Sequence, residues 1–244
     1  MLGLSSNMHR VLTTFIFFLF SIAYSKNIAY SDLVKIEGIY YMASSSFPFT
    51  GKVNGIIQGN FVIGKKEGQH IKYYKNGNIL SKSNFNKGIP DGEWIEFYYN
   101  GNLLSKRNYE NGKLQGLYID YYRIGQILTI RNYINGNLDG DHLSFYKNGL
   151  LQKKQFYNAG KLEGKYLIYH EYELEKKIQL KVKGFYRNGK LEGEYLEFDE
   201  QGRLRGKSFY KNGKLEGEYL HFNIKGKLIE KRIYKNGVLI DVKA

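Results

Sequence analysis

The chain has 244 residues, of which 37 are Lys or Arg and 23 are Asp or Glu, and its formal net charge is +14. It contains no Cys, which excludes a disulfide framework, a thiolate metal site and a cysteine nucleophile. Hydrophobic residues make up 42% and aromatic residues 16%, too much for a disordered chain, and 28 Gly beside 2 Pro indicate a β protein with many turns.

The N-terminus has the pattern of a secretory signal peptide. His9 and Arg10 precede an apolar run over residues 11–22, and small residues follow it. The run is shorter than the roughly 18 residues of a membrane-spanning helix, so we predict a signal peptide over residues 1–25, cleaved between Ser25 and Lys26. An uncleaved N-terminal anchor is the alternative. No Cys follows the run, so we expect no lipoprotein, and export leads to the periplasm, the cell surface or the exterior.

A repeat of 24 residues fills residues 61–241, after a lead-in segment over residues 26–60. Each unit opens with an aromatic residue, and glycines recur three, seven and sixteen residues later in most units. The array amounts to about seven and a half repeats. The opening residues are Phe61, Phe85, Tyr109, Tyr133, Tyr157, Tyr186, Tyr210 and Tyr234.

The glycines predict β-hairpins. Many follow Asn, and Asn-Gly between apolar runs is a strong signal for a two-residue turn because both residues tolerate positive φ. A second turn is expected over segments such as residues 188–193 (NGKLEG). Short connections make successive strands neighbours, so the predicted fold is all-β: an elongated, single-layer antiparallel meander of stacked hairpins. The Asn-Gly pairs include Asn76-Gly77, Asn100-Gly101, Asn188-Gly189 and Asn212-Gly213.

Strand alternation predicts which residues share a face. Ile95, Phe97 and Leu103, with their equivalents in the other units, are all apolar or aromatic and are expected to form a buried face. The opposite face, with Trp94 and Glu96, mixes rings and charges and is expected to be amphipathic and exposed.

One unit is five residues longer than the others, with the extra residues at 170–183. Glu173 stands there in place of the expected turn glycine. The flanking units keep their register, so we interpret this segment as a lengthened hairpin and not as a domain boundary.

The units resemble a known repeat. Residues 186–198 (YRNGKLEGEYLEF) and 210–222 (YKNGKLEGEYLHF) closely resemble the bacterial variant of the MORN repeat, and residues 40–52 are similar to the segment that often opens such proteins. The resemblance covers residues 40–240 and implies an elongated sheet of stacked hairpins. Some family members are labelled antitoxins of toxin–antitoxin pairs, and eukaryotic relatives have been linked to membranes or scaffolding. This chain differs from such antitoxins in its predicted export signal, which would separate it from a toxin that acts in the cytoplasm.

No motif predicts catalysis, a cofactor or a metal site, and we predict a non-enzymatic protein. His70 and His142 stand in a column that elsewhere holds rings, so we interpret them as substitutes for aromatic residues. Acids recur six residues after most unit openings, and a group copied in every unit is expected to be structural, as exposed charge at the turns. These acids are Glu67, Asp91, Asp139, Glu163, Glu192 and Glu216.

The predicted function is a repeat scaffold that binds a protein partner, or itself, through its extended sheet. Aromatic residues are enriched in binding hot spots, although the same rings could serve only to stabilise cross-strand pairs. Alternatives are an antitoxin or immunity protein that neutralises a toxin, and a basic protein that associates with anionic envelope surfaces; export disfavours nucleic acid. The candidate partner-binding residues are Tyr74, Trp94, Tyr98, Tyr118, Tyr122, Tyr146, Tyr166, Tyr195 and Tyr219.

Overall fold

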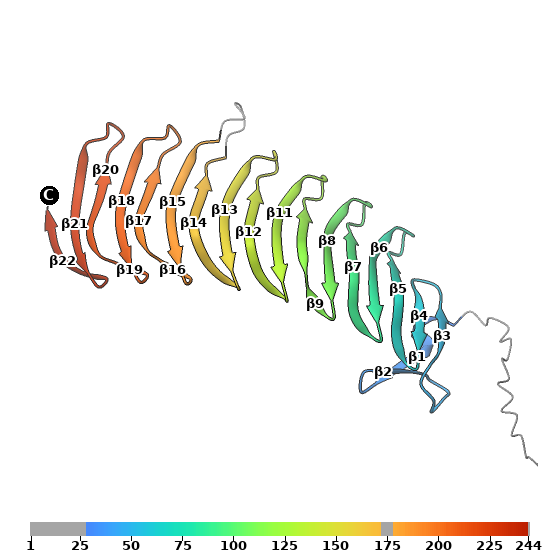
Figure 1. The fold of residues 1–244 in the computed structure, drawn as a ribbon. Coiled ribbons are helices and arrows are strands. Elements are labelled where there is room, and N and C mark those ends of the chain that lie inside the picture. The colour runs from blue at the N-terminus through green and yellow to red at the C-terminus, as the bar shows by residue number, and fades with distance from the viewer. Residues whose placement is uncertain (1–27, 172–177, 244) are drawn as a thin grey trace, which may run out of the picture.

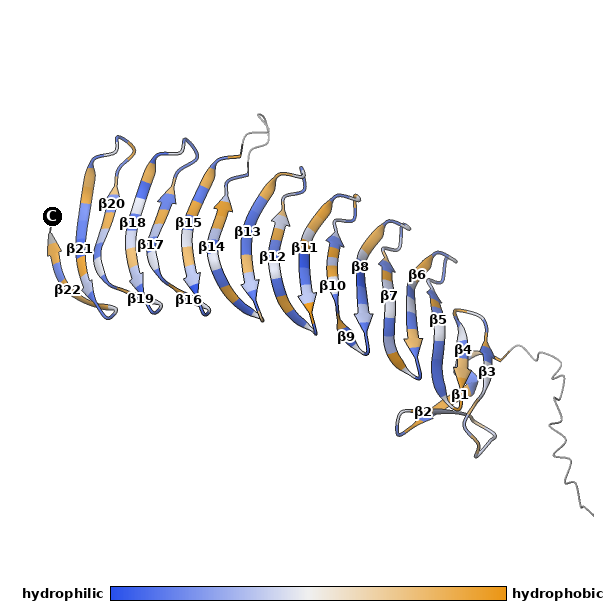
Figure 2. Ribbon diagram, in the orientation of Figure 1, coloured by the Kyte–Doolittle hydropathy of each residue, from blue (hydrophilic) through white to orange (hydrophobic). Residues whose placement is uncertain are grey.

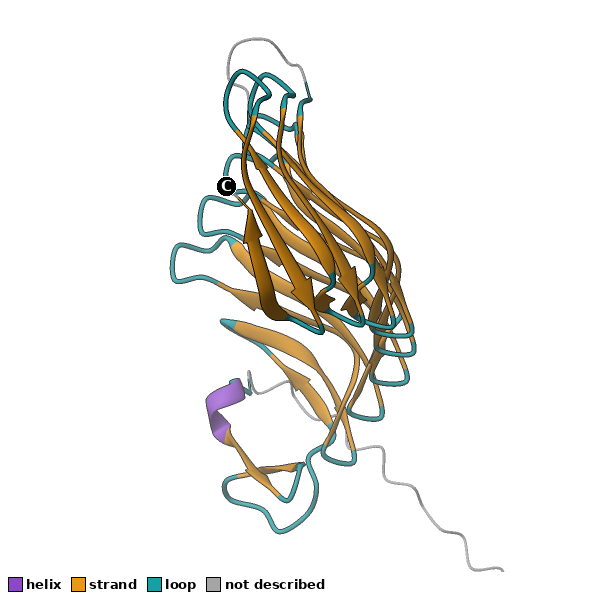
Figure 3. Cartoon of the chain, turned by 90° about the vertical axis from the view of Figure 1, so that its left-hand side faces the viewer, coloured by secondary structure: helices purple, strands orange, loops and turns teal. Residues whose placement is uncertain are grey.

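The chain forms one long, open antiparallel sheet (Figure 1). The computed structural model describes residues 28–171 and 178–243, so the predicted signal peptide and its cleavage site lie outside the described residues. The sheet has 20 strands, from β3 (Gly51–Val53) to β22 (Val238–Lys243). These two strands lie at opposite ends of the ribbon, and Figure 3 shows curved strands with no second layer on the array. The predicted all-β meander is confirmed.

The array alternates long strands with short connections. Most strands between β4 and β21 have six to nine residues, and three of two residues arise where a bulge interrupts a longer strand. The remaining strands are β4 (Ile57–Val62), β5 (Lys65–Tyr73), β6 (Ile79–Asn86), β7 (Ile89–Phe97), β8 (Leu103–Glu110), β9 (Lys113–Leu114), β10 (Gly116–Tyr121), β11 (Ile127–Ile134), β12 (Asn137–Phe145), β13 (Leu151–Asn158), β14 (Lys161–Tyr169), β15 (Leu180–Arg187), β16 (Lys190–Leu191), β17 (Gly193–Phe198), β18 (Leu204–Lys211), β19 (Lys214–Leu215), β20 (Gly217–Phe222) and β21 (Leu228–Lys235).

Two kinds of turn alternate along the sheet. At one edge both turn residues have positive φ, as at Asn188 (51°) and Gly189 (78°), which is the two-residue turn that Asn-Gly predicts. At the other edge only the glycine does, and the loop is longer. There the Tyr74 N–H donates to the Asn78 carbonyl at 2.8 Å, and the Asn76 side chain accepts from the Asn78 N–H at 3.1 Å. The two-residue turn predicted at Asn76-Gly77, and likewise at Asn100-Gly101, is therefore wrong.

The segment predicted as a second turn, residues 188–193, continues as strand after Gly189. Lys190 and Leu191 form β16, and β17 begins at Gly193, whose φ of +79° marks a bulge. A turn was expected at Gly193 because glycine is common both in turns and in β-bulges. Here the extra residue bends the strand without reversing it.

The two broad faces differ from the expected distribution of burial. We call the face with residues 71, 95, 119, 143, 167, 196 and 220 the aliphatic face, and the face with residues 70, 94, 118, 142, 166, 195 and 219 the aromatic face. Ile95, Phe97 and Leu103 on the aliphatic face are only half-buried. The small polar side chains on the aromatic face are buried instead, with Ser105 at 2% and Gln155 at 6% exposure. The predicted buried face is wrong, because no second layer covers it within residues 28–171 and 178–243.

Apolar side chains are thus spread along the array. Figure 2 shows hydrophobic and hydrophilic stretches alternating along the strands, as expected of a sheet without a second layer. Among the described residues, the cluster of buried apolar side chains, Phe49, Val53 and Phe61, lies at the first strands of the sheet. A 3-10 helix, η1 (Tyr30–Asp32), and a separate hairpin of β1 (Leu33–Ile36) and β2 (Ile39–Met42) contribute packing residues there.

The lengthened unit leaves the sheet continuous. β14 and β15 pair across the insertion with Tyr169 opposite Leu180. The His170 N–H donates to the Gln179 carbonyl at 2.9 Å, which closes the longer loop. Residues 172–177, including Glu173, lie outside the described residues.

Candidate binding surface

A row of rings runs along the aromatic face. The centroids of Phe85 and Trp94 are 5.6 Å apart, and those of Trp94 and Tyr109 are 5.4 Å apart. Such pairs contribute about 0.5–1.5 kcal/mol beyond the area that they bury. The predicted partner-binding rings of this row are half-buried: Trp94, Tyr118, Tyr166, Tyr195 and Tyr219. The expected exposure of this column is therefore wrong, because neighbouring rings cover each member. Partner binding through it stays a prediction.

The other four predicted tyrosines connect successive units. Each hydroxyl donates a hydrogen bond to a backbone carbonyl 23 residues further along the chain. We call this set the tyrosine ladder. Its bonds are Tyr74 to Phe97 (2.8 Å), Tyr98 to Tyr121 (2.7 Å), Tyr122 to Phe145 (2.8 Å) and Tyr146 to Tyr169 (2.8 Å). The ladder gives these tyrosines a structural role at the loop edge.

A charged network crosses the aromatic face beside Trp94. Glu96 accepts hydrogen bonds from the Ser105 hydroxyl (2.9 Å) and from Arg107 Nη1 (2.8 Å). Arg107 also donates to the Tyr109 and Tyr118 hydroxyls at 3.2 and 3.3 Å, and its side chain is only 10% exposed. Hydrogen bonding from Arg107 is the main reason that the pKa of Glu96 is lowered. The pair is thus ionised and internally satisfied.

The next unit repeats this arrangement 24 residues later. Asp120 accepts from the Thr129 hydroxyl at 2.9 Å and pairs with Arg131. The Arg131 guanidinium lies 4.3 Å from the centroid of the Tyr118 ring, and the Arg107 guanidinium lies 5.2 Å from it. Tyr118 therefore contacts two arginines, a favourable cation–π geometry. Burial is the main reason that its pKa is raised.

Two histidines belong to the ring row, as predicted. The centroid of the His70 ring lies 5.2 Å from those of Phe61 and Phe85, and the centroid of the His142 ring lies 5.9 Å from that of Tyr157. Burial lowers the pKa of each imidazole to about 4, so both are neutral at pH 7. No group of three or more metal-ligating side chains occurs among the described residues.

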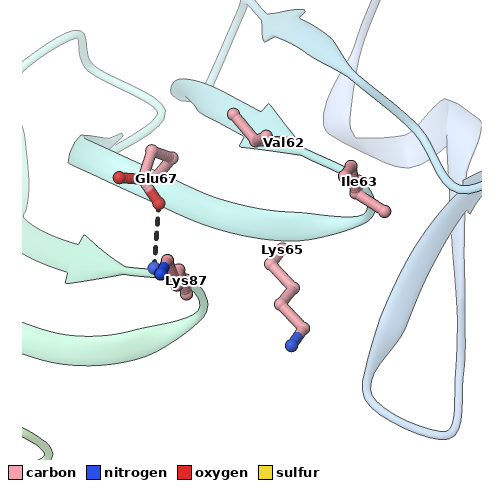
Figure 4. A pocket seen from close by; sticks show the side chains of 5 residues that line it. All are labelled: Val62, Ile63, Lys65, Glu67 and Lys87. Carbon is pink, nitrogen blue, oxygen red and sulfur yellow. Dashed lines mark hydrogen bonds between the residues drawn. The ribbon is translucent and has the colours of Figure 1, made fainter.

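The acids that recur six residues after each unit opening act at the two-residue turns. The Glu67 carboxylate accepts from the Lys87 backbone N–H at 2.8 Å, across a pocket of about 380 Å³ that Val62, Ile63 and Lys65 also line (Figure 4). Further acceptors are Asp91, Gln115, Asp139, Glu163, Glu192 and Glu216, paired with the N–H groups of residues 111, 135, 159, 188, 212 and 236. We call these bonds the turn ladder. The acids were expected to be structural, but only as exposed charge. The sequence signal for the bonds was that Gln115, an uncharged acceptor, stands in the same column.

Lysines in the middle of the aliphatic face pair with carboxylates on the neighbouring strand. Each pair is cross-strand and about half-exposed, and such surface pairs contribute about 0–1 kcal/mol. The pairs are Lys106–Glu93, Lys154–Asp141 (2.9 Å), Lys207–Glu194 (2.6 Å) and Lys231–Glu218. Some of the lysines that give the chain its net positive charge are thus paired with carboxylates on this face.

Comparison with known proteins supports the repeat assignment. The family model described as the MORN repeat variant matches residues 66–87, 90–111, 191–212 and 204–223, all within the hairpin array. Comparison with curated proteins gave no match. In the part of the chain that the structure describes, no helix is long and apolar enough to span a membrane.

Proposed function

Because the chain is a MORN-repeat protein, we propose that it is an exported scaffold that acts by binding, not by catalysis. Its ligand is a protein partner, or a second copy of itself, held on the extended sheet. Residues 1–25 motivate the export part of the proposal by their sequence alone.

One observation carries the binding part. The sheet presents two broad faces with no second layer over them among the described residues, and its apolar columns are left half-buried. Repeat arrays draw their stability from contacts between neighbouring units, which leaves an extended surface for a partner. Here the tyrosine ladder and the turn ladder supply such contacts at the two edges. The faces are therefore available for recognition.

Photocrosslinking in the cells that make the protein tests the binding role. The crosslinking amino acid p-benzoylphenylalanine would replace Lys72 on the aromatic face, or Leu117 or Phe209 on the aliphatic face, so that first and last units are both sampled. Lys87 at a turn is the control. We expect an adduct with one defined protein, or with a second copy, from at least one face and not from Lys87. The absence of an adduct at both faces would overturn the proposal. Fractionation of the same cells tests export, which a purely cytoplasmic location would contradict.

A further inference from the structure

The aliphatic face changes character between the first and the last units. The residue before each unit-opening aromatic lies on this face, and in the first units it is Asn84, Asn108 or Asn132. Two of these amides donate to bulge carbonyls, Asn84 to Glu93 and Asn132 to Asp139, both at 2.8 Å. In later units the same column holds Phe156, Phe185 and Phe209. These three units therefore lack an amide that stabilises the bulge and carry a ring instead, and the last unit carries Ile233.

The rings that replace these amides are accessible. Phe156 is 41% exposed and Phe209 is 47% exposed, and Phe185 is half-buried between them in the same column. No layer covers this column among the described residues. Exposed rings at a regular spacing indicate an interaction surface when they form a continuous patch.

Cations stand opposite one another beside these rings. Arg187 lies opposite Lys190, and Lys211 lies opposite Lys214, at two successive two-residue turns. All four are exposed, and none has an acidic partner among the described residues, although Lys207, on the same strand as Lys211, pairs with Glu194. Like charges directly opposite in a sheet are destabilising. The fold does not require this pairing, because the equivalent residues of an earlier unit are Glu110 and Lys113.

The cations are held along the edge in register. A Cβ on Gly213 would lie 3.6 Å from the Lys190 Cβ, and a Cβ on Gly237 would lie 3.6 Å from the Lys214 Cβ. Each lysine stem thus lies along the next turn. Successive units are about 10 Å apart, since each contains two strands at a spacing of about 4.8 Å. Rings and cations therefore repeat together at that interval. We call Phe185, Arg187, Lys190, Phe209, Lys211 and Lys214 the basic–aromatic strip.

We propose that the basic–aromatic strip is the docking site for an acidic, apolar segment of the protein partner. The inference rests on the proposed function and adds the location and the chemistry of the partner. Carboxylates of the segment would meet the four cations, and its apolar side chains would pack on the two rings. Aromatic residues and Arg are enriched in hot spots, and complementary charge gives specificity.

The carboxylates nearby favour a protein segment over a phosphate polymer or an anionic bilayer. Glu194 lies directly opposite Phe209 in the sheet, and Glu192 and Glu216 bind the turns that the strip borders. A closely spaced row of phosphates would meet these acids as well as the cations. A peptide carries separate carboxylates with apolar side chains between them, which fits the alternation of the strip.

Crosslinking from matched columns tests the location. The photoreactive residue would replace Phe185 or Phe209 in the strip, and Asn84 or Asn108 in the same column of the first units. We expect adducts with the partner from the strip and not from Asn84 or Asn108. Adducts only from the first units or from the aromatic face would overturn this inference and leave the proposed function intact. No adduct from any face position would overturn both.

Purified protein and defined probes test the chemistry. The probes are a fluorescent peptide of alternating Glu and Leu, its Lys and Leu counterpart, oligothymidylate, and vesicles of phosphatidylcholine and phosphatidylglycerol. We expect the Glu–Leu peptide to bind in physiological salt, and the K190Q/K214Q variant to bind it about tenfold more weakly. The matched control K65Q/K113Q changes the same column of earlier units and should leave binding unchanged.

A second variant removes the rings without new strain. F185N/F209N restores the residue that the first units carry in this column, and it should also weaken peptide binding while circular dichroism stays unchanged. Equal binding of the Lys–Leu peptide, tighter binding of oligothymidylate or of the vesicles, or an equal loss in K65Q/K113Q would each overturn the inference.

Discussion

The hydroxyl of Tyr98 donates a hydrogen bond of 2.7 Å to the carbonyl of Tyr121, which lies one unit further along the chain. The same bond recurs from Tyr74, Tyr122 and Tyr146. Each bond joins a loop to its next neighbour and to no other unit. Residues that the sequence indicated for partner binding therefore stabilise the stacking of hairpins.

Removal of one hydroxyl should measure this contribution. We expect Tyr98→Phe to lower the free energy of unfolding by about 1 kcal/mol, because the ring stays and one internal hydrogen bond is lost. Urea unfolding followed by circular dichroism gives the value. Tyr99→Phe is the matched control, since the neighbouring Tyr99 is 55% exposed and its hydroxyl takes no part in the ladder. Equal effects of the two changes would contradict a structural role for the ladder.

The turn ladder requires an acceptor and not a charge. Glu192 accepts from the Asn212 N–H at 2.8 Å, and the uncharged Gln115 does the same for Asn135 at 2.9 Å. Glu192→Gln should therefore leave stability within about 0.5 kcal/mol of the natural chain, whereas Glu192→Ala should cost about 1 kcal/mol. Thermal unfolding of the two variants checks this. A loss for Gln as large as that for Ala would show that the charge itself matters.

The Glu96–Arg107 pair should be costly to break from one side. Arg107→Leu leaves Glu96 facing Ser105 without its cation, and we expect a loss of about 3 kcal/mol. The double variant E96L/R107L should recover most of it, because both charges are removed. Arg187→Leu, at an exposed turn, is the control and should change stability by less than about 0.5 kcal/mol. Losses that simply add in the double variant would show that the two side chains are not coupled.

His142 should make the fold sensitive to acid. Its pKa is about 4 in the folded chain, lowered first by burial and then by Lys153 and Arg131, against about 6.5 in an unfolded chain. Its contribution to stability is therefore complete above pH 6.5 and is lost as the pH falls towards 4.

His142→Tyr isolates that contribution, since Tyr118 and Tyr166 occupy the same column. The variant should lose less stability than the natural chain between pH 7 and pH 4. Urea midpoints at each pH, with the imidazole titration followed by NMR, provide the measurement. A titration near 6.5 in the folded natural chain would disprove the assignment.

Lys190→Glu should stabilise the fold while it damages binding. It places opposite charges across the turn from Arg187, in place of like charges, and we expect a gain of about 0.2–1 kcal/mol. Thermal unfolding tests the gain, with Lys113→Glu as the reverse control, because it sets like charges opposite Glu110. A loss of stability for Lys190→Glu would remove the argument that the strip retains an unfavourable pairing.

The fold was predictable because its information is periodic. The register of 24 residues places turns, bulges and rings at fixed intervals. An assignment made in one unit can therefore be tested against the same position in the next unit. The two kinds of turn were harder to separate. Asn76-Gly77 and Asn188-Gly189 are the same dipeptide, but the first lies within a longer loop that the Tyr74 N–H closes on the Asn78 carbonyl.

Burial on the two faces could not be predicted from alternation. Alternation shows that Trp94 and Glu96 share a face, but not which face has better coverage. In a single layer the cover comes from neighbouring side chains on the same face. Glu96 and Arg107 both contact the buried Ser105 side chain, whereas Ile95 is only half-buried.

The strip was missed because its members are far apart in the sequence. Phe185 and Phe209 look like ordinary β residues when each is taken alone, and Lys190 and Lys214 look like turn charges. The two-residue turns place the like charges opposite each other, but only the sheet register brings the two units' rings and cations together on one face. The available signal was the change from Asn to Phe in one column halfway along the array.

The tyrosine ladder ends before the last hairpins. The His170 Nε2–H donates to the Phe198 carbonyl at 2.9 Å, but Asp199 and Asn223, in the same column, bond only within their own loops. Amide hydrogens at the Asn223 loop should thus exchange with solvent sooner than those at residues 74–146, because no bond of this kind ties that loop to a neighbouring unit. The hairpins that carry the strip keep the turn ladder at one edge but lose the tyrosine ladder at the other, and a bound segment would hold successive units together.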